Sequence, residues 1–132
     1  MANILLIDDD SVSRMACAHL LRRRGHLVIE AADGYVGTDI YARCHPDIVV
    51  LDIYMPRQDG FETIRAIRNS DMTIPIIVLT TPDTMIDLSV LIIAKLLGAN
   101  NGFYKPVSDE FCKFIDQLDA ECLPLMNRIL PV

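Results

Sequence analysis

Asp52 is the residue of this chain whose position best suits chemistry. It follows an aliphatic run, residues 48–51, and such a run is typical of a strand covered on both faces of a parallel sheet. A turn sequence, residues 53–60, comes next, so the carboxylate leaves the sheet at its carboxyl edge, where open α/β sheets bind ligands. An acid in that place binds a cation, acts as a nucleophile, or serves only as a hydrogen-bonded turn residue.

Other reactive residue types stand at the ends of further apolar runs, and the carboxyl ends of parallel strands lie side by side. They are Asp8, Asp9 and Asp10, Thr80 and Thr81, and Lys105. Grouped carboxylates repel unless a cation neutralises them, and Mg²⁺ binds carboxylate and phosphate oxygens together. A hydroxyl and an ammonium would hold a phosphate oxygen. Singly, each residue is more often part of a solvated turn, loop or cap; the joint pattern favours a phosphoryl-accepting aspartate.

Five strands alternating with five helices would position these side chains. The strands are predicted at Asn3–Asp8, Leu27–Ala31, Asp47–Leu51, Pro75–Leu79 and Gly102–Tyr104. The helices are predicted at Ser11–Arg24, Gly34–Arg43, Phe61–Arg68, Thr84–Leu97 and Ser108–Cys122, with Ser11 and Ser108 as N-caps. Strict alternation implies a parallel sheet with right-handed crossovers and helices on both faces.

Length and composition narrow the class of protein. The 132 residues suit one domain, and the net charge of −6 argues against direct nucleic-acid binding. No apolar stretch reaches the ~18 residues of a membrane span, and no signal peptide is visible, so we expect a soluble, cytoplasmic protein without membrane insertion. The cysteines are far apart and without C-x-x-C spacing, which favours reduced thiols over zinc: Cys17, Cys44, Cys112 and Cys122.

The chain resembles the receiver domains of response regulators. The resemblance rests on residues 4–10 (ILLIDDD), 51–60 (LDIYMPRQDG), 78–80 (VLT) and 104–106 (YKP), of which the D-x-x-M-P-x-x-D-G run is the most specific. It covers essentially the whole chain, as a single receiver domain over residues 1–132 with an apolar C-terminal tail at 123–132. It implies a flavodoxin-like, doubly wound α/β fold: a five-stranded parallel sheet in the order 2-1-3-4-5 with five helices.

The resemblance also implies a role for each site residue. Asp52 would accept a phosphoryl group from a sensor histidine kinase or a phosphotransfer protein, and the chain would catalyse only its own phosphorylation and dephosphorylation. Mg²⁺ is the implied cofactor, with the ligands Asp8, Asp9, Asp52 and the backbone carbonyl of Tyr54. Thr80 and Lys105 would hold the phosphoryl group and carry the signal outward.

The sequence departs from the receiver pattern at two places. Receivers usually have an aromatic residue three positions before the lysine, where this chain has Gly102; Tyr104, on the same strand face, could fill part of the gap. In the predicted fourth helix, ten of the thirteen residues from 85 to 97 are apolar. This favours either a helix buried almost all round or an interface helix.

The function expected is a phosphorylation-dependent interaction switch of two-component signal transduction. Its output would be binding of a downstream protein or self-dimerisation through helix 4, strand 5 and helix 5. One alternative is a receiver-like docking module that works without phosphorylation. Another, an aspartate-nucleophile phosphatase, is disfavoured because such enzymes want a second acid two residues after the nucleophile, where this chain has Tyr54. The sequence does not identify the kinase, the target or the oligomeric state.

Overall fold

A computed structural model describes residues 1–82 and 87–122 of the chain. The first residues of the predicted fourth helix and the apolar tail at 123–132 lie outside this described part. Within it, strands and helices alternate along the chain in the predicted order.

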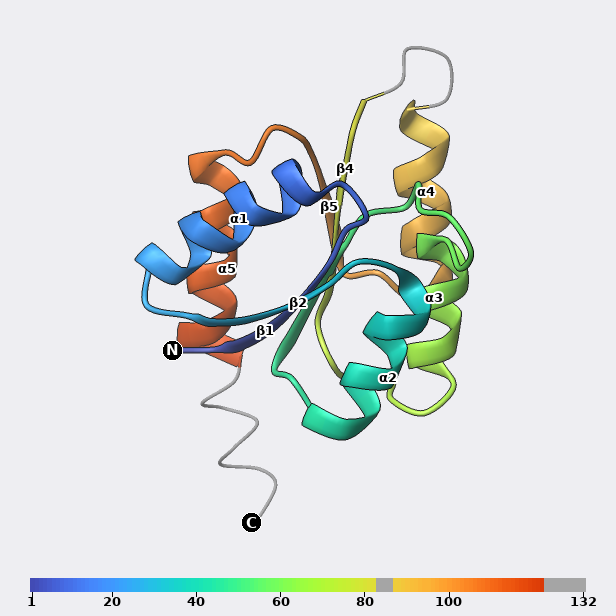
Figure 1. Ribbon diagram of the computed structural model, residues 1–132, viewed down its shortest axis with the longest axis horizontal. Coiled ribbons are helices and arrows are strands. Elements are labelled where there is room, and N and C mark those ends of the chain that lie inside the picture. Colours follow the sequence, from blue (N-terminus) through green and yellow to red (C-terminus); the bar gives the residue numbers. More distant parts are fainter. Residues whose placement is uncertain (83–86, 123–132) are drawn as a thin grey trace.

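The described strands form one parallel sheet, as predicted (Figure 1). They are β1 (Asn3–Ile7), β2 (Leu27–Ala31), β3 (Ile48–Leu51), β4 (Ile76–Thr80) and β5 (Asn101–Tyr104). Their spatial order is β2-β1-β3-β4-β5, which confirms the order expected for a doubly wound fold. All residues of β3 and β4 are buried, as their aliphatic sequences predict.

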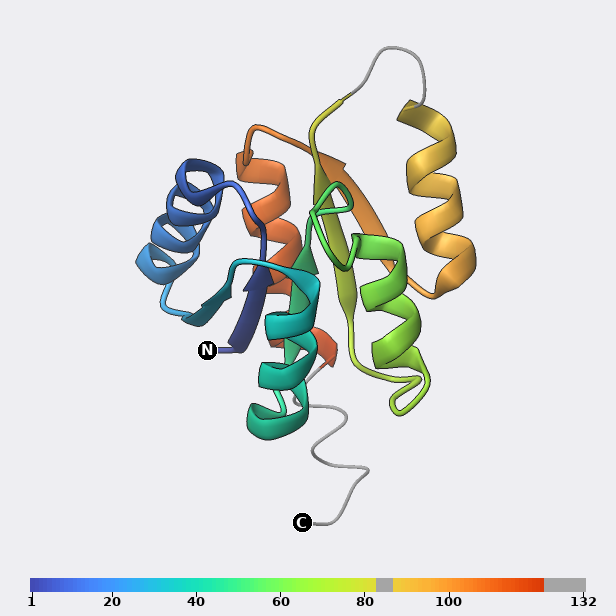
Figure 2. The same ribbon diagram turned by 45° about the vertical axis from the view of Figure 1, so that its right-hand side comes forward.

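Helices cover both faces of the sheet. They are α1 (Ser11–Arg23), α2 (Gly34–Cys44), α3 (Gly60–Arg68), α4 (Asp87–Leu97) and α5 (Asp109–Gln117), followed by the π-helical turn η1 (Leu118–Cys122). Figure 2 shows α1 and α5 on one side and α2, α3 and α4 on the other. Each face has its own core: Leu21 and Phe111 belong to the α1–α5 side, and Ile64 and Ile67 to the opposite side.

The predicted N-cap of the first helix is wrong by one residue. Asp10, not Ser11, is the N-cap, because its carboxylate accepts hydrogen bonds from the amides of Val12 and Ser13. The prediction for Ser108 is confirmed: its hydroxyl accepts from the amide of Phe111, at 3.2 Å. Helix α3 likewise begins one residue before the predicted start, at Gly60.

Helix α4 is both a core helix and an exposed one. Val90 and Ala94 are buried against the sheet, whereas Ile92 and Leu96 are 56% and 81% exposed and Ile93 is also exposed. The reading of a helix buried almost all round is therefore wrong, because only one side of α4 is buried. An interface on its exposed side stays a prediction. No helix in the described ranges has the length and hydrophobicity to cross a membrane.

Leu91 of α4 fills the space above Gly102. A Cβ atom placed on Gly102 would lie 2.6 Å from Leu91 Cδ2, well inside normal carbon contact. The nearest side chain therefore comes from α4 and not from the strand itself, and the expectation that Tyr104 fills part of the gap stays a prediction. Tyr104 is 37% exposed.

Candidate functional site

The sheet brings the predicted site residues to one edge. Asp8 follows β1, Asp52 follows β3, Thr80 is the last residue of β4, and Lys105 follows β5. These strands are neighbours in the sheet, and each pair runs parallel. Their carboxyl ends therefore meet at the upper edge of the sheet in Figure 1, as the sequence predicts.

Asp8, Asp9 and Asp52 form an acidic cluster with room for a cation. One carboxylate oxygen of each lies within 4.8 Å of the others. Asp8 and Asp52 are buried, whereas Asp9 is exposed. Asp10 does not join the cluster, since its carboxylate caps α1. The hard oxygen ligands of this cluster suit Mg²⁺ rather than a soft metal.

Lys105 lies against two of these carboxylates. Its Nζ donates to Asp8 Oδ2 at 2.7 Å and to Asp52 Oδ2 at 3.1 Å. Its ammonium is itself largely buried, and hydrogen bonds to Asp8 together with the charge of Asp52 raise the pKa of Lys105 although burial alone would lower it. The single positive charge of Lys105 does not balance the three carboxylates of Asp8, Asp9 and Asp52, so binding of a further cation is electrostatically favoured.

Asp52 is held in a defined orientation. Its Oδ1 accepts a hydrogen bond from the amide of Ile53 at 2.7 Å, and its Oδ2 faces Lys105. Burial raises the pKa of Asp52; the charge of Lys105 opposes that rise and the charge of Asp8 adds to it. The carboxylate therefore keeps a basic oxygen in a partly desolvated place, which suits a nucleophile.

The hydroxyl of Thr80 is an unsatisfied polar group at this edge. Thr80 is 1% exposed, and its Oγ1 has no hydrogen-bond partner among the described residues. Buried hydroxyls are rarely left unpaired without a functional reason. A ligand oxygen held near Asp52 and Lys105 would supply the missing partner, so this observation also fits a phosphate-binding site.

The loop after β3 supplies the remaining predicted ligand, Tyr54. The amide of Gly60 donates to the carbonyl of Ile53 at 2.8 Å and closes the base of this loop. A Cβ atom on Gly60 would lie 2.4 Å from the Asp52 carbonyl oxygen, which explains a glycine there. Tyr54 itself is exposed in this loop, two residues after Asp52, and the role of its backbone carbonyl as a ligand stays a prediction.

Sequence reasoning missed two residues that brace the site. Arg14 of α1 donates to the backbone carbonyl of Asp8 at 2.8 Å and to Glu30 at 3.2 Å. Gln58 is buried in the loop that carries Tyr54 and donates to groups of α2 and α3. A glutamine inside an otherwise turn-like run was the signal available for Gln58; nothing in the sequence distinguishes Arg14 from a surface arginine.

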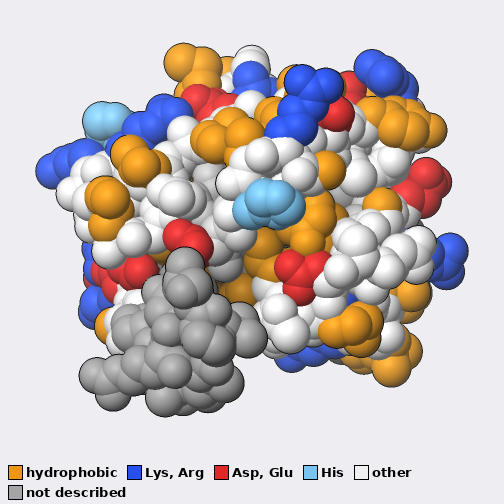
Figure 3. Space-filling model, turned by 90° about the horizontal axis from the view of Figure 1, so that it is seen from below, with side chains coloured by type: hydrophobic (Ala, Val, Ile, Leu, Met, Phe, Trp, Pro, Cys, Tyr) orange, Lys and Arg blue, Asp and Glu red, His pale blue; other side chains and the backbone are white. Residues whose placement is uncertain are grey.

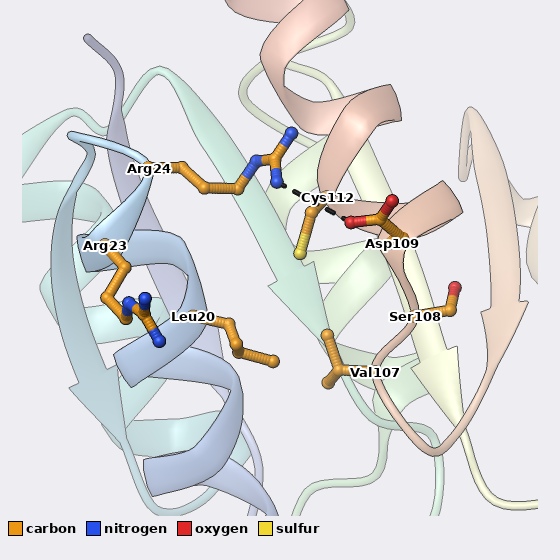
Figure 4. A pocket seen from close by; sticks show the side chains of 7 residues that line it. All are labelled: Leu20, Arg23, Arg24, Val107, Ser108, Asp109 and Cys112. Atoms are coloured by element: carbon orange, nitrogen blue, oxygen red, sulfur yellow. Dashed lines mark ion pairs between the residues drawn. The ribbon is translucent and has the colours of Figure 1, made fainter.

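Several pockets in the described part of the chain lie away from the acidic cluster. One of about 400 Å³ lies between α1 and α5, with Leu20, Val107 and Cys112 on its walls and the Arg24–Asp109 ion pair at its rim (Figure 4). Burial raises the pKa of the Cys112 thiol, so this cysteine is not an activated nucleophile. Another, of about 620 Å³, lies near the amino ends of β1 and β2, and its apolar lining residues include Leu27, Val28 and Pro46. Figure 3 shows the side of the molecule on which those strand ends lie.

Comparisons with known proteins agree with this geometry. The sequence profile of the response regulator receiver domain matches residues 4–114. The transcriptional regulatory protein AfsQ1 of Streptomyces coelicolor is 40% identical over 128 residues, 97% of this chain but 52% of AfsQ1. Protein PilH of Pseudomonas aeruginosa is 34% identical over 112 residues, 83% of this chain and 90% of PilH. The chain thus spans about half the length of relatives such as AfsQ1 and nearly all of PilH.

Solved structures have the same fold. The chemotaxis protein CheY4 of Vibrio cholerae superposes with a TM-score of 0.77 at 29% identity, covering 91% of this chain and 98% of that chain. A response regulator receiver domain protein from Clostridium thermocellum gives a TM-score of 0.82 at 27% identity, covering 94% and 99%.

Proposed function

Because the chain belongs to the response regulator receiver domain family, we propose that Asp52 accepts a phosphoryl group from the phosphohistidine of a sensor kinase or phosphotransfer protein. The observation that carries this proposal is the edge of the sheet where three carboxylates, one ammonium and a hydroxyl without a partner among the described residues converge. Each group matches one requirement of phosphoryl transfer to a carboxylate.

In this mechanism, a carboxylate oxygen of Asp52 attacks phosphorus. The phosphorus–nitrogen bond to the donor imidazole breaks, a phosphorus–oxygen bond to Asp52 forms, and the imidazole leaves with the electron pair. The hydrogen bond from the Ile53 amide to Oδ1 orients the carboxylate for this attack. Asp8, Asp9, Asp52 and the Tyr54 carbonyl would hold Mg²⁺, which when bound neutralises negative charge on the phosphoryl oxygens.

Lys105 and Thr80 would then stabilise the product. The ammonium of Lys105 already lies 3.1 Å from Asp52, within reach of a phosphoryl oxygen placed there. Donation by the Thr80 hydroxyl to another phosphoryl oxygen would satisfy the group that otherwise lacks a partner. Both side chains lie at the ends of β4 and β5, so they connect the phosphoryl group to α4 and the last strand.

We further propose that residues 1–132 act as one receiver domain in the cytoplasm, without direct contact to nucleic acid or membrane. This chain covers PilH and CheY4 nearly end to end, which supports a single receiver domain over these residues. Catalysis would be limited to its own phosphorylation and dephosphorylation. The intact acidic cluster with Asp52 and Lys105 argues against a docking module that works without phosphorylation.

The output would be binding of a downstream protein or self-dimerisation through the α4–β5–α5 face. Ile92, Ile93 and Leu96 provide an exposed apolar surface on α4, and such surfaces mark contact sites. Because Leu91 lies directly on Gly102, a displacement of α4 would replace the rotation of an aromatic ring. We therefore expect phosphorylation to change β5 itself less than α4.

Intact-protein mass spectrometry with phosphoramidate and Mg²⁺ tests the proposed chemistry. We expect the wild type to gain one phosphoryl group and Asp52→Asn to gain none. Asp10→Asn, which removes a neighbouring exposed carboxylate outside the cluster, is the control and should gain the group normally. A wild type that gains nothing, or an Asp52→Asn variant that gains as much as the wild type, would refute the assignment.

A further inference from the structure

Gln58 joins three elements around the loop that carries Tyr54. It is 7% exposed, and its Nε2 lies 3.0 Å from Thr38 Oγ1 of α2 and 3.0 Å from Thr63 Oγ1 of α3. The Gly34 carbonyl at the start of α2 is a third acceptor, at 3.1 Å. The side chain of one loop residue thus reaches both helices that flank the loop.

The hydrogen bonds of both threonines point in a fixed direction. The Thr38 hydroxyl donates to the Gly34 carbonyl at 2.7 Å, and the Thr63 hydroxyl donates to the Asp59 carbonyl at 2.8 Å. Since a hydroxyl has one proton, both oxygens can only accept from Gln58. The two amide protons of Gln58 thus face three acceptors, these two hydroxyl oxygens and the Gly34 carbonyl, and an apolar side chain of similar size would supply no donor to them.

The contact between the loop and α2 leaves no spare room. A Cβ atom on Gly34 would lie 2.3 Å from Thr63 Oγ1 and 2.6 Å from the Gln58 carbonyl oxygen. On the outer side of the loop, Arg57 donates to Asp33 at 3.1 Å. The start of α2 is thus pressed against the loop and bonded to two consecutive loop residues.

We propose that Gln58 is a positioning residue for the cation site: it fixes the loop between Asp52 and Asp59 against α2 and α3, and so holds the Tyr54 carbonyl where the acidic cluster needs a further oxygen. This inference rests on the proposed function, since it concerns Mg²⁺ at that site. Gln58 touches neither the phosphoryl group nor the cation. It acts through the loop, as outer supports of metal sites do.

The test is Mg²⁺ affinity measured without phosphoryl transfer, by NMR titration with MgCl₂ followed at the amide of Ile53, which donates to Asp52. Gln58→Leu keeps the approximate volume and removes the NH₂ group; we expect its Mg²⁺ dissociation constant to rise about tenfold. Gly34→Ala places a methyl group between α2 and the loop, so it should also raise the Mg²⁺ dissociation constant. At saturating Mg²⁺, the rate of phosphorylation of Gln58→Leu by phosphoramidate should be within about twofold of the wild-type rate, because the substitution weakens only cation binding.

Tyr41→Phe is the matched control. It removes the 2.8 Å hydrogen bond to Asp71 near the other end of α2, so it should lower stability without changing Mg²⁺ affinity. If Gln58→Leu does not fold, Thr38→Val removes one of the two acceptors and takes its place. If the variant keeps the wild-type Mg²⁺ affinity while the wild type binds Mg²⁺ and is phosphorylated, the role of Gln58 is overturned and the proposed function is not. A wild type that does neither overturns the proposed function itself.

Discussion

The contact between Leu91 and Gly102 predicts a measurable coupling between α4 and β5. In Gly102→Ala, the new methyl group would lie 2.6 Å from Leu91 Cδ2, about 1 Å closer than carbon atoms pack. Overpacking costs about 1–3 kcal/mol, and the loss of glycine flexibility in the unfolded chain returns about 0.4–1 kcal/mol. Because the clash is with the end of a flexible side chain, we expect a net loss of stability of about 1 kcal/mol.

Leu91→Ala removes the other half of the contact. Leu91 is only partly buried, so its truncation should cost about 2 kcal/mol, at the low end for a leucine in a core. With Leu91 truncated, alanine at 102 no longer clashes and should stabilise the protein slightly. The double variant should therefore be more stable than the two single changes predict, with a coupling energy of about 1.5 kcal/mol.

Urea unfolding of the wild type, both single variants and the double variant measures this coupling, provided that the m-values agree. The same cycle with Leu96→Ala in place of Leu91→Ala is the control, because Leu96 is 81% exposed, and should show additivity. Additive effects of Gly102→Ala and Leu91→Ala would show that the two residues do not share a packing contact. In that case, α4 would not take the place of an aromatic ring above Gly102.

Two further predictions concern the site and the exposed face. Lys105→Met leaves the buried carboxylates of Asp8 and Asp52 without their ammonium, so metal-free stability at pH 7 should fall by about 3 kcal/mol. Burial already raises the pKa of Asp52 and the charge of Lys105 lowers it, so the pKa of Asp52 rises further in Lys105→Met. The loss of stability is therefore complete above this folded-state pKa and disappears as pH falls through it, because Asp52 then becomes protonated and neutral. Urea unfolding across a pH series checks this pH dependence. On the α4 face, Leu96→Glu should abolish any phosphorylation-dependent dimer seen by light scattering, whereas Met72→Glu, equally exposed but in the loop before β4, should not; a dimer that survives Leu96→Glu would place the interface elsewhere.

The sheet and the position of the site could be predicted because the relevant signals are local in sequence. The aliphatic runs of β3 and β4 indicate strands buried on both faces, and they are. Since parallel strands end at one edge, the residues that follow them were expected to meet, and Asp8, Asp52 and Lys105 lie within hydrogen-bonding distance. Asp10 was missed as the N-cap of α1 because aspartate and serine are almost equally good N-caps, and spacing alone does not choose between them.

The supports of the site could not be predicted, because they depend on which side chains meet across elements. Gln58 and Thr38 are 20 residues apart in sequence, and their hydrogen bond requires the start of α2 to lie against the loop after β3. Leu91 and Gly102 likewise meet only because α4 packs on β5 at a distance set by their volumes. Periodicity assigns each residue to a face of its own element but does not give its partner.

If Asp52 is phosphorylated as proposed, the register of β4 and β5 suggests how a change at the site would reach the surface. Thr80 pairs with Tyr104, and Val78 pairs with Gly102, so the unpaired hydroxyl and the glycine under Leu91 lie two residues apart along the same pair of strands. A phosphoryl oxygen that draws in Thr80 would move the end of β4, to which the following helix is connected. Leu91 is on the same helix as the exposed Ile92, Ile93 and Leu96, so any shift of Leu91 on Gly102 also moves that apolar surface. With glycine at position 102, we therefore expect the coupling to run through a displacement of α4 instead of a side-chain rotation.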